Sequence, residues 1–173
     1  FKSVQNYKIS IPQGFTSTSD LLPIANSKCY SILVVPTSQA SYDNTSLDKF
    51  DIIHGRQEDL QRFQFQVSGK LVPDRKVECI PVRFNQIMSS QYSYELIKAL
   101  GAADIPFRNI KSAQQNFVIP LQLGQDRFSQ DLRGEDVILN QEYGTRSKAL
   151  LVKIYVSHER VLHISQSGVT VSR

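Results

Sequence analysis

The chain has 173 residues, with 20 Lys+Arg against 16 Asp+Glu, a formal net charge of +4, and 40% hydrophobic residues. That length is typical of one domain, so we expect a single β domain over residues 1–173, with a core large enough to fold without disulfides or bound metal ions. The 8 Gly and 2 Cys are too few for a collagen-like chain or a disulfide scaffold, and the apolar content is too high for a disordered chain.

Hydropathy and charge exclude further classes of protein. The longest apolar run lies around Ile32–Val35 and is far shorter than the roughly 20 residues of a membrane span. The polar segment Phe1–Asn6 is not typical of a secretory signal, and it begins without Met, so we expect a processed chain or part of a longer one. The basic residues are scattered, which favours a solvated surface over a nucleic-acid-binding patch.

Apolar residues alternate with polar ones along much of the chain, a pattern typical of half-buried strands. In the first half it predicts strands at 7–11, 29–35, 63–67 and 77–84. The first three stop at Pro12, at Pro36 and at Ser68-Gly69. Pro81 lies inside the fourth, which favours an edge strand or a bulge because proline cannot donate a main-chain hydrogen bond.

The second half continues this pattern. It predicts strands at 117–123, 137–139, 149–156, 161–164 and 169–171. Pro120 favours an edge or irregular position for the first of these. The strand at 149–156 is the strongest, because its even-numbered residues from Leu150 to Val156 are all apolar and share one face. Eight or nine strands at such intervals are typical of a sandwich or barrel, so we predict an all-β antiparallel sandwich.

One segment, Ser89–Gly101, breaks the alternation and predicts a helix. Ser89 or Ser90 is suited to cap its first N–H groups. Leu96, Ile97 and Leu100 would form its apolar stripe, and Gly101 is suited to a left-handed C-terminal cap. A single short helix in a β protein usually plugs the open end of a sandwich, and we expect that position here.

Three polar stretches predict loops, at Gly14–Asn26, Thr37–Asp48 and Gln125–Asp136. The second contains the glycosylation sequence Asn44-Thr45-Ser46, which matters only in a secretory setting. The sequence contains neither an interdomain linker nor an internal repeat. The whole chain is therefore expected to form one domain.

Patterns that resemble catalytic or metal-binding motifs are incomplete. His158 and His163 are five residues apart, whereas a zinc-protease helix needs a spacing of four, and in a strand the two would point to opposite faces. The segment Ser46–Lys49 matches Ser-x-x-Lys but lacks the companion motifs of the enzymes that use it. Asp43, Asp48 and Asp51 do not match an EF-hand, and a solvated acidic loop is favoured over a calcium site.

Cys29 and Cys79 share no metal-binding spacing, and two buried thiols are favoured over a disulfide. We therefore predict no catalytic, cofactor-binding or metal-binding residues, no cofactor, no small-molecule substrate and a non-enzymatic function. A Ser-His-acid triad assembled from distant residues stays open, because sequence alone does not settle it.

Two binding functions remain as alternatives. Arg62, Phe63 and Phe65 could bind single-stranded nucleic acid by stacking bases on the rings, although a sandwich core explains Phe63, Phe65 and Val67 without a ligand. A ligand-binding β-sandwich, such as a carbohydrate-binding or adhesion module, would instead need a flat aromatic platform. The candidates for that platform are Tyr30, Tyr42, Tyr92 and Tyr94, in a chain without Trp.

From Arg62 to the C-terminus, strand, helix and loop segments follow in a distinctive order. The segments are Phe63–Pro73, the helix Tyr94–Leu100, Asn116–Leu121, the loop Asp131–Val137 and the strand Lys148–Val156. This order resembles one jelly-roll module of the double jelly-roll major capsid proteins of DNA viruses, the hexon-like proteins of Polinton-like viruses, virophages and tailless phages.

The resemblance implies an antiparallel jelly-roll sandwich of about eight strands with one short helix. It also implies a structural coat subunit of a virion. Such a subunit would pack with copies of itself into a trimeric or pentameric capsomer, beside other capsid proteins, with weak contact to the genome or an internal membrane. A double module needs about twice this length. The chain would therefore be one half of a longer coat protein, or a single jelly-roll coat or vertex protein.

Overall fold

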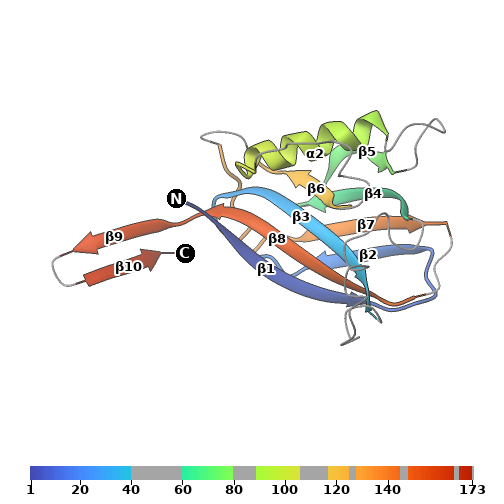
Figure 1. The fold of residues 1–173 in the computed structure, drawn as a ribbon, viewed down its shortest axis with the longest axis horizontal. Coiled ribbons are helices and arrows are strands. Elements are labelled where there is room, and N and C mark those ends of the chain that lie inside the picture. Colours follow the sequence, from blue (N-terminus) through green and yellow to red (C-terminus); the bar gives the residue numbers. More distant parts are fainter. Residues whose placement is uncertain are drawn as a thin grey trace, which may run out of the picture.

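Eight strands form two antiparallel sheets that pack face to face (Figure 1). The computed structural model describes residues 1–39, 60–79, 89–105, 117–124, 128–144, 148–165 and 168–172. The first sheet contains, in spatial order, β1 (Lys2–Ile11), β8 (Leu150–Glu159), β3 (Cys29–Ser38) and β6 (Ile119–Gln122). The second contains β2 (Ser17–Leu22), β7 (Val137–Tyr143), β4 (Leu60–Val67) and β5 (Lys70–Glu78).

The strand order identifies the topology. β1 pairs with β8 and β3 with β6 in one sheet, while β2 pairs with β7 and β4 with β5 in the other. The chain thus follows the course of one long hairpin whose paired arms are wrapped alternately into the two sheets. This is the eight-stranded jelly roll. The prediction of an all-β jelly-roll sandwich with one short helix is confirmed.

The core lies between the sheets and is apolar. The inward-facing residues Leu150, Val152, Ile154 and Val156 of β8 are all fully buried, as the alternation predicted. Phe65 on β4 and Leu139 on β7 are register partners in the second sheet and are equally buried. Removing such surfaces from water is the main favourable term in folding this sandwich.

β2 and β7 differ from the sequence prediction. The stretch Gly14–Asn26, predicted as a loop, contains β2, and the short strand predicted at 137–139 runs on to Tyr143. β2 is an edge strand whose only fully buried residue is Leu22, so its sequence carries no apolar alternation. In β7 the inward position 141 is a glutamine, which accepts a hydrogen bond from the Tyr143 hydroxyl at 2.6 Å. A polar residue at an inward position broke the pattern.

The prolines lie where the sheet does not need their missing N–H. Pro120 lies in β6, an edge strand, as predicted. Pro36 does not end β3, which continues to Ser38. β6 pairs only with Ser31–Val34 of β3, so the position facing Pro36 on that side is past the end of β6. The strand predicted at 77–84 is the end of β5, which stops at Glu78, and Pro81 lies outside the described residues.

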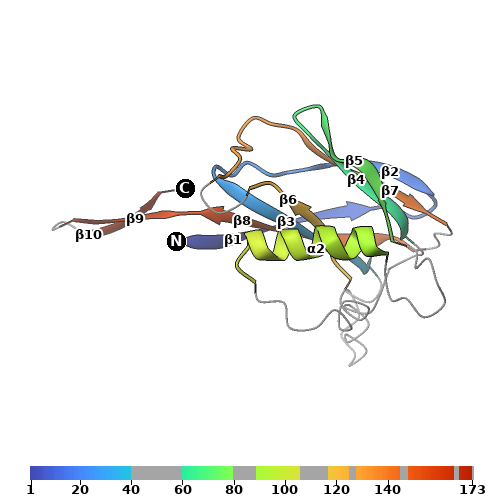
Figure 2. The ribbon, with the colours of Figure 1, turned by 90° about the horizontal axis from the view of Figure 1, so that it is seen from above.

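The predicted helix is present as α2 (Ser90–Ala102), capped by the Ser89 side chain, which accepts a hydrogen bond from the N–H of Tyr92. Gly101 lies inside the helix, and the expected left-handed glycine cap is wrong: Ala103 is the C-cap and the positive φ falls at Asp104. Ile97 is 47% exposed, and the buried face instead includes Tyr92 and Ala99. The helix lies along the side of the sandwich, against β6, rather than across an end (Figure 2).

The last two strands form a separate hairpin, β9 (Val161–Ser165) and β10 (Gly168–Ser172). β9 follows β8 almost directly, and the hairpin projects from the sandwich at the end where the N-terminus lies (Figures 1 and 2). An isolated two-stranded hairpin is marginally stable in water, and neither four-stranded sheet includes β9 or β10.

Candidate interaction surfaces

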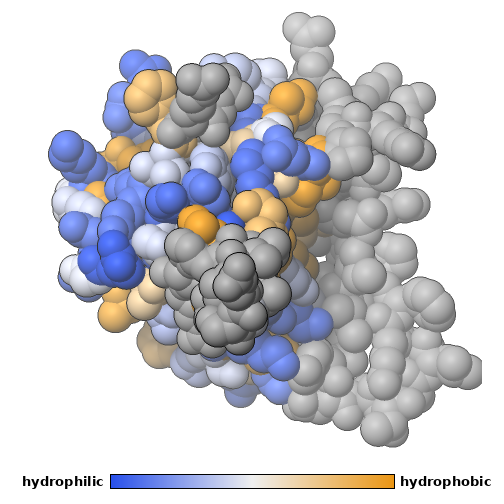
Figure 3. Space-filling view, turned by 90° about the vertical axis from the view of Figure 1, so that its left-hand side faces the viewer, coloured by the Kyte–Doolittle hydropathy of each residue, from blue (hydrophilic) through white to orange (hydrophobic). Residues whose placement is uncertain are grey.

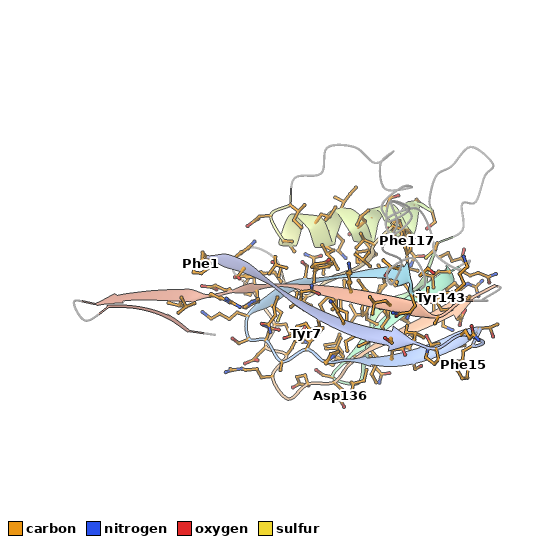
Figure 4. The ribbon with its side chains drawn as sticks, turned by 60° about the horizontal axis from the view of Figure 1, so that its bottom comes forward. Phe1, Tyr7, Phe15, Phe117, Asp136 and Tyr143 are labelled. Atoms are coloured by element: carbon orange, nitrogen blue, oxygen red, sulfur yellow. The ribbon has the colours of Figure 1, made fainter. Side chains whose placement is uncertain are left out.

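The buried aromatic cluster under α2 joins the helix to both sheets. The Tyr92 ring stacks on Phe117 with a centroid distance of 5.2 Å and meets Phe63 edge-on at 6.4 Å. The Tyr92 hydroxyl donates to the main-chain oxygen of Val118 at 2.6 Å. Figure 4 shows Phe117 beneath the helix. Burial raises the pKa of Tyr92, which fits a structural role.

This cluster removes two of the predicted platform residues from the surface. Tyr92 is fully buried and Tyr30 is 6% exposed, so neither can present a ring to a sugar. Tyr94 is exposed on α2, and Tyr42 lies outside the described residues. Among the described candidates only Tyr94 is exposed, so Tyr30, Tyr92 and Tyr94 do not form a flat platform together.

The nucleic-acid alternative loses its stacking rings in the same way. Phe63 and Phe65 are 1% and 0% exposed, which confirms the interpretation of these residues as core. Arg62 is on the opposite face of β4, where its guanidinium lies 3.2 Å from Glu78 and 3.8 Å from Glu142. The rings and the charge thus lie on different faces of the strand.

Arg62 belongs to a polar network on the outer face of the second sheet. Lys76 forms an ion pair with Glu142, and the Ser19 hydroxyl donates to the Asn140 side chain at 2.6 Å. These residues line a shallow hollow of about 220 Å³. Cations and anions alternate across three strands, so the charges largely satisfy one another, and the face is a hydrophilic platform rather than a charged one. The residues that form this platform come from separate strands, and they become neighbours only through the register of the sheet.

A second polar cluster lies beside β1. Asn26 accepts a hydrogen bond from the Tyr7 hydroxyl and donates to Gln5 at 2.8 Å. Arg133 lies beside it and forms two short contacts with Asp131, at 3.0 and 2.6 Å. Hydrogen bonds from Arg133 lower the pKa of Asp131 to about 2. Gln5, Tyr7, Asn26 and Arg133 line a hollow of about 300 Å³, and the hydrogen bonds of Asn26 tie β1 to the segment that precedes β3.

Of the candidate motif residues, only His158 and His163 lie in the part of the chain that the structure describes. Among the described residues, no cluster of three or more His, Cys, Asp or Glu is arranged to hold a metal ion. His158 is buried and its pKa is lowered by desolvation, while His163 lies on the projecting strand β9. The Ser46–Lys49 segment, Asn44, and Asp43, Asp48 and Asp51 lie outside the described residues.

Both cysteines are buried thiols outside any disulfide, in agreement with the prediction. The Cys29 thiol lies 3.3 Å from the main-chain oxygen of Asn26. Burial, and the nearby Asp131 carboxylate, raise the pKa of Cys29 to about 12. A thiol with such a pKa is neutral at physiological pH and therefore a poor nucleophile.

The exposed edge of β1 is the most regular surface feature. β1 pairs with β8 over ten successive positions without a register shift, and it is the edge of its sheet. Its N-terminal end, at Phe1, lies where the hairpin leaves the body (Figure 4). Seen from that end, the coloured surface is mostly hydrophilic, with apolar residues in small groups (Figure 3). Local sequence does not reveal which strand of a sandwich is an edge, so this surface was missed.

Comparisons with known proteins add no relative. No protein-family model matches the chain, and no curated protein matches it significantly. Within the described residues, no helix is long and apolar enough to cross a membrane.

Proposed function

We propose that this chain is a structural coat module of a DNA virus, which packs with copies of itself into the trimeric or pentameric capsomers of an icosahedral virion. The observation that carries the proposal is the strand order, with β1-β8-β3-β6 facing β2-β7-β4-β5. This jelly-roll topology is found in viral capsid proteins, lectins and cupins. The proposal therefore depends on what distinguishes a coat subunit from the other two classes.

The interior argues against a ligand cavity. The space between the sheets is filled by buried side chains such as Phe65, Leu139 and Ile154. His158 and Cys29 are buried too, but the described residues contain no cluster of three His, Cys, Asp or Glu that could hold a metal ion, as a cupin-like site would need. The outer face of the second sheet is a platform of mutually paired polar groups. Among the described residues, the core is filled and this face is internally paired, so the strand edges and the projecting hairpin remain as candidate contact surfaces.

The projecting hairpin supports assembly. β9 and β10 pair with each other and extend beyond the sandwich, and such an extension gains stability when a neighbour packs against it. Coat subunits act through many identical contacts, which this segment would provide. The resemblance to double jelly-roll coat proteins adds the same expectation, and it implies other capsid proteins and weak genome or internal-membrane contact as further partners.

The test is the assembly state. Sedimentation velocity of the purified chain over a wide concentration range should show a closed oligomer of three or five copies, and mass spectrometry of particles from the native source should detect the chain. A variant truncated after Glu159, which lacks the hairpin, should assemble more weakly than the intact chain. Circular dichroism should show that its sandwich is still folded. A strictly monomeric chain at high concentration, absent from every particle, would end the proposal.

A further inference from the structure

The main-chain N–H and C=O groups of β1 point alternately toward β8 and away from it. Phe1 and Arg160 exchange both main-chain hydrogen bonds, at 3.0 and 2.9 Å. In an antiparallel ladder such pairs alternate, so the odd-numbered residues of β1 direct their N–H and C=O groups toward β8. The even-numbered residues, among them Lys2, Val4 and Asn6, direct their N–H and C=O groups away from β8, in the plane of the sheet. Among the described residues, no strand pairs with that side.

The other edges of the two four-stranded sheets carry features that oppose pairing. β6 contains Pro120 and is covered by α2. β5 contains Pro73 and has a register shift against β4, followed by the charged run Asp74–Lys76. β2 has only six residues. β1 has ten residues, no proline and no bulge, and long regular edges of this kind are templates for another strand.

One position on this edge is apolar where its neighbours are polar. Val4 is 58% exposed and points outward between Lys2 and Asn6. A strand that brought an apolar residue opposite Val4 would remove both from water. In a second copy, Val4 itself is that apolar residue when the two β1 strands run antiparallel about a two-fold axis at Val4.

In that arrangement the outward main-chain groups around Val4 are hydrogen-bonded, and the lysines of the two copies do not face each other. Val4 exchanges two hydrogen bonds with Val4 of the copy, and Lys2 faces Asn6 on either side of the axis. No lysine lies opposite a lysine. The two Val4 side chains share a face at the close spacing of directly opposed residues, which favours β-branched pairs. A two-fold contact of this type is self-complementary, as closed homo-oligomers require.

We infer that the outer edge of β1 binds β1 of a second copy in antiparallel register, with the two-fold axis at Val4, so that two four-stranded sheets become one of eight strands. The inference deepens the proposed coat function, because it names one contact between copies. Such a contact would join two capsomers, since a two-fold axis does not generate a ring of three or five.

Cysteine cross-linking tests the register. Val4→Cys places two thiols across the axis at the roughly 5.5 Å Cα separation of a hydrogen-bonded pair, which suits a disulfide. Oxidation with diamide should convert Val4→Cys to a covalent dimer. In the matched variant Asn6→Cys the two positions are four residues out of register, roughly 14 Å apart, and it should stay monomeric on a denaturing gel. The native thiols are buried and should not contribute.

A second pair of variants tests the energetics. Val4→Lys puts like charges directly opposite each other and should raise the dimer dissociation constant at least about tenfold in sedimentation equilibrium. Ser19→Lys adds the same charge at an exposed position of β2 and should leave the constant unchanged. Cross-linking of Asn6→Cys in place of Val4→Cys, or equal effects of the two lysines, would overturn the inference. If capsomers still form in that case, the coat function stands and only this contact falls.

Discussion

Replacing Tyr92 tests how α2 is fixed to the sandwich. Tyr92→Phe removes the hydroxyl that donates to Val118 O at 2.6 Å and accepts from Val118 N at 3.3 Å. Leaving buried main-chain groups unpaired costs about 1–3 kcal/mol. Val118 is only partly buried, so water can replace part of the bond, and we expect about 1–2 kcal/mol. Tyr92→Ala also removes the ring between Phe117 and Phe63, and should cost about 3–5 kcal/mol.

Urea unfolding followed by circular dichroism measures both losses. With the slope of about 1–3 kcal/mol per molar expected for such domains, Tyr92→Phe should lower the midpoint by roughly 0.5–1 M and Tyr92→Ala by about twice that or more. Tyr94→Phe is the matched control, because Tyr94 is 61% exposed on the same helix, and it should change the free energy of unfolding by less than about 0.5 kcal/mol. Equal effects of Tyr92→Phe and Tyr94→Phe would refute the anchoring role.

Three further outcomes follow from burial. Phe65→Ala should destabilise the fold by about 3–5 kcal/mol in urea unfolding, whereas Gln66→Ala next to it should stay within about 0.5 kcal/mol; similar losses would contradict the assigned strand faces. Cys29 and Cys79 should react with a thiol reagent only on unfolding, and rapid labelling of the native protein would show that they are accessible. Folding raises the pKa of Tyr92. The stability that its neutral hydroxyl contributes is therefore complete below the unfolded pKa near 10 and is lost as the pH rises above it. Between pH 8 and 11 the free energy of unfolding should fall more for wild type than for Tyr92→Phe.

Sequence predicted the elements whose side chains follow a simple period. β8 and the second half of β1, from Tyr7 to Ile11, were identified by strict alternation, and α2 by its serine cap and apolar content. β2 was missed because Leu22 is the only fully buried residue of this edge strand, so its sequence lacks the apolar alternation. The glycine cap was wrong because α2 continues one residue past Gly101, where no left-handed backbone is required. Such outcomes depend on tertiary contacts that a local pattern does not contain.

The interaction surfaces were harder to predict than the fold. The ion pairs of Arg62 with Glu78 and Glu142 join three strands, and their pairing depends on the register between β5, β4 and β7. The edge position of β1 depends on the strand order of the whole jelly roll. The tyrosines considered as a platform are separated because α2 buries Tyr92 and exposes Tyr94.

The oligomeric state of the intact chain tests the central claim most directly. Sedimentation velocity combined with electron microscopy of particles from the native source should show symmetric capsomers of three or five copies built from this jelly roll. A chain that stays monomeric at every concentration, and that occurs in no particle, would contradict the coat function.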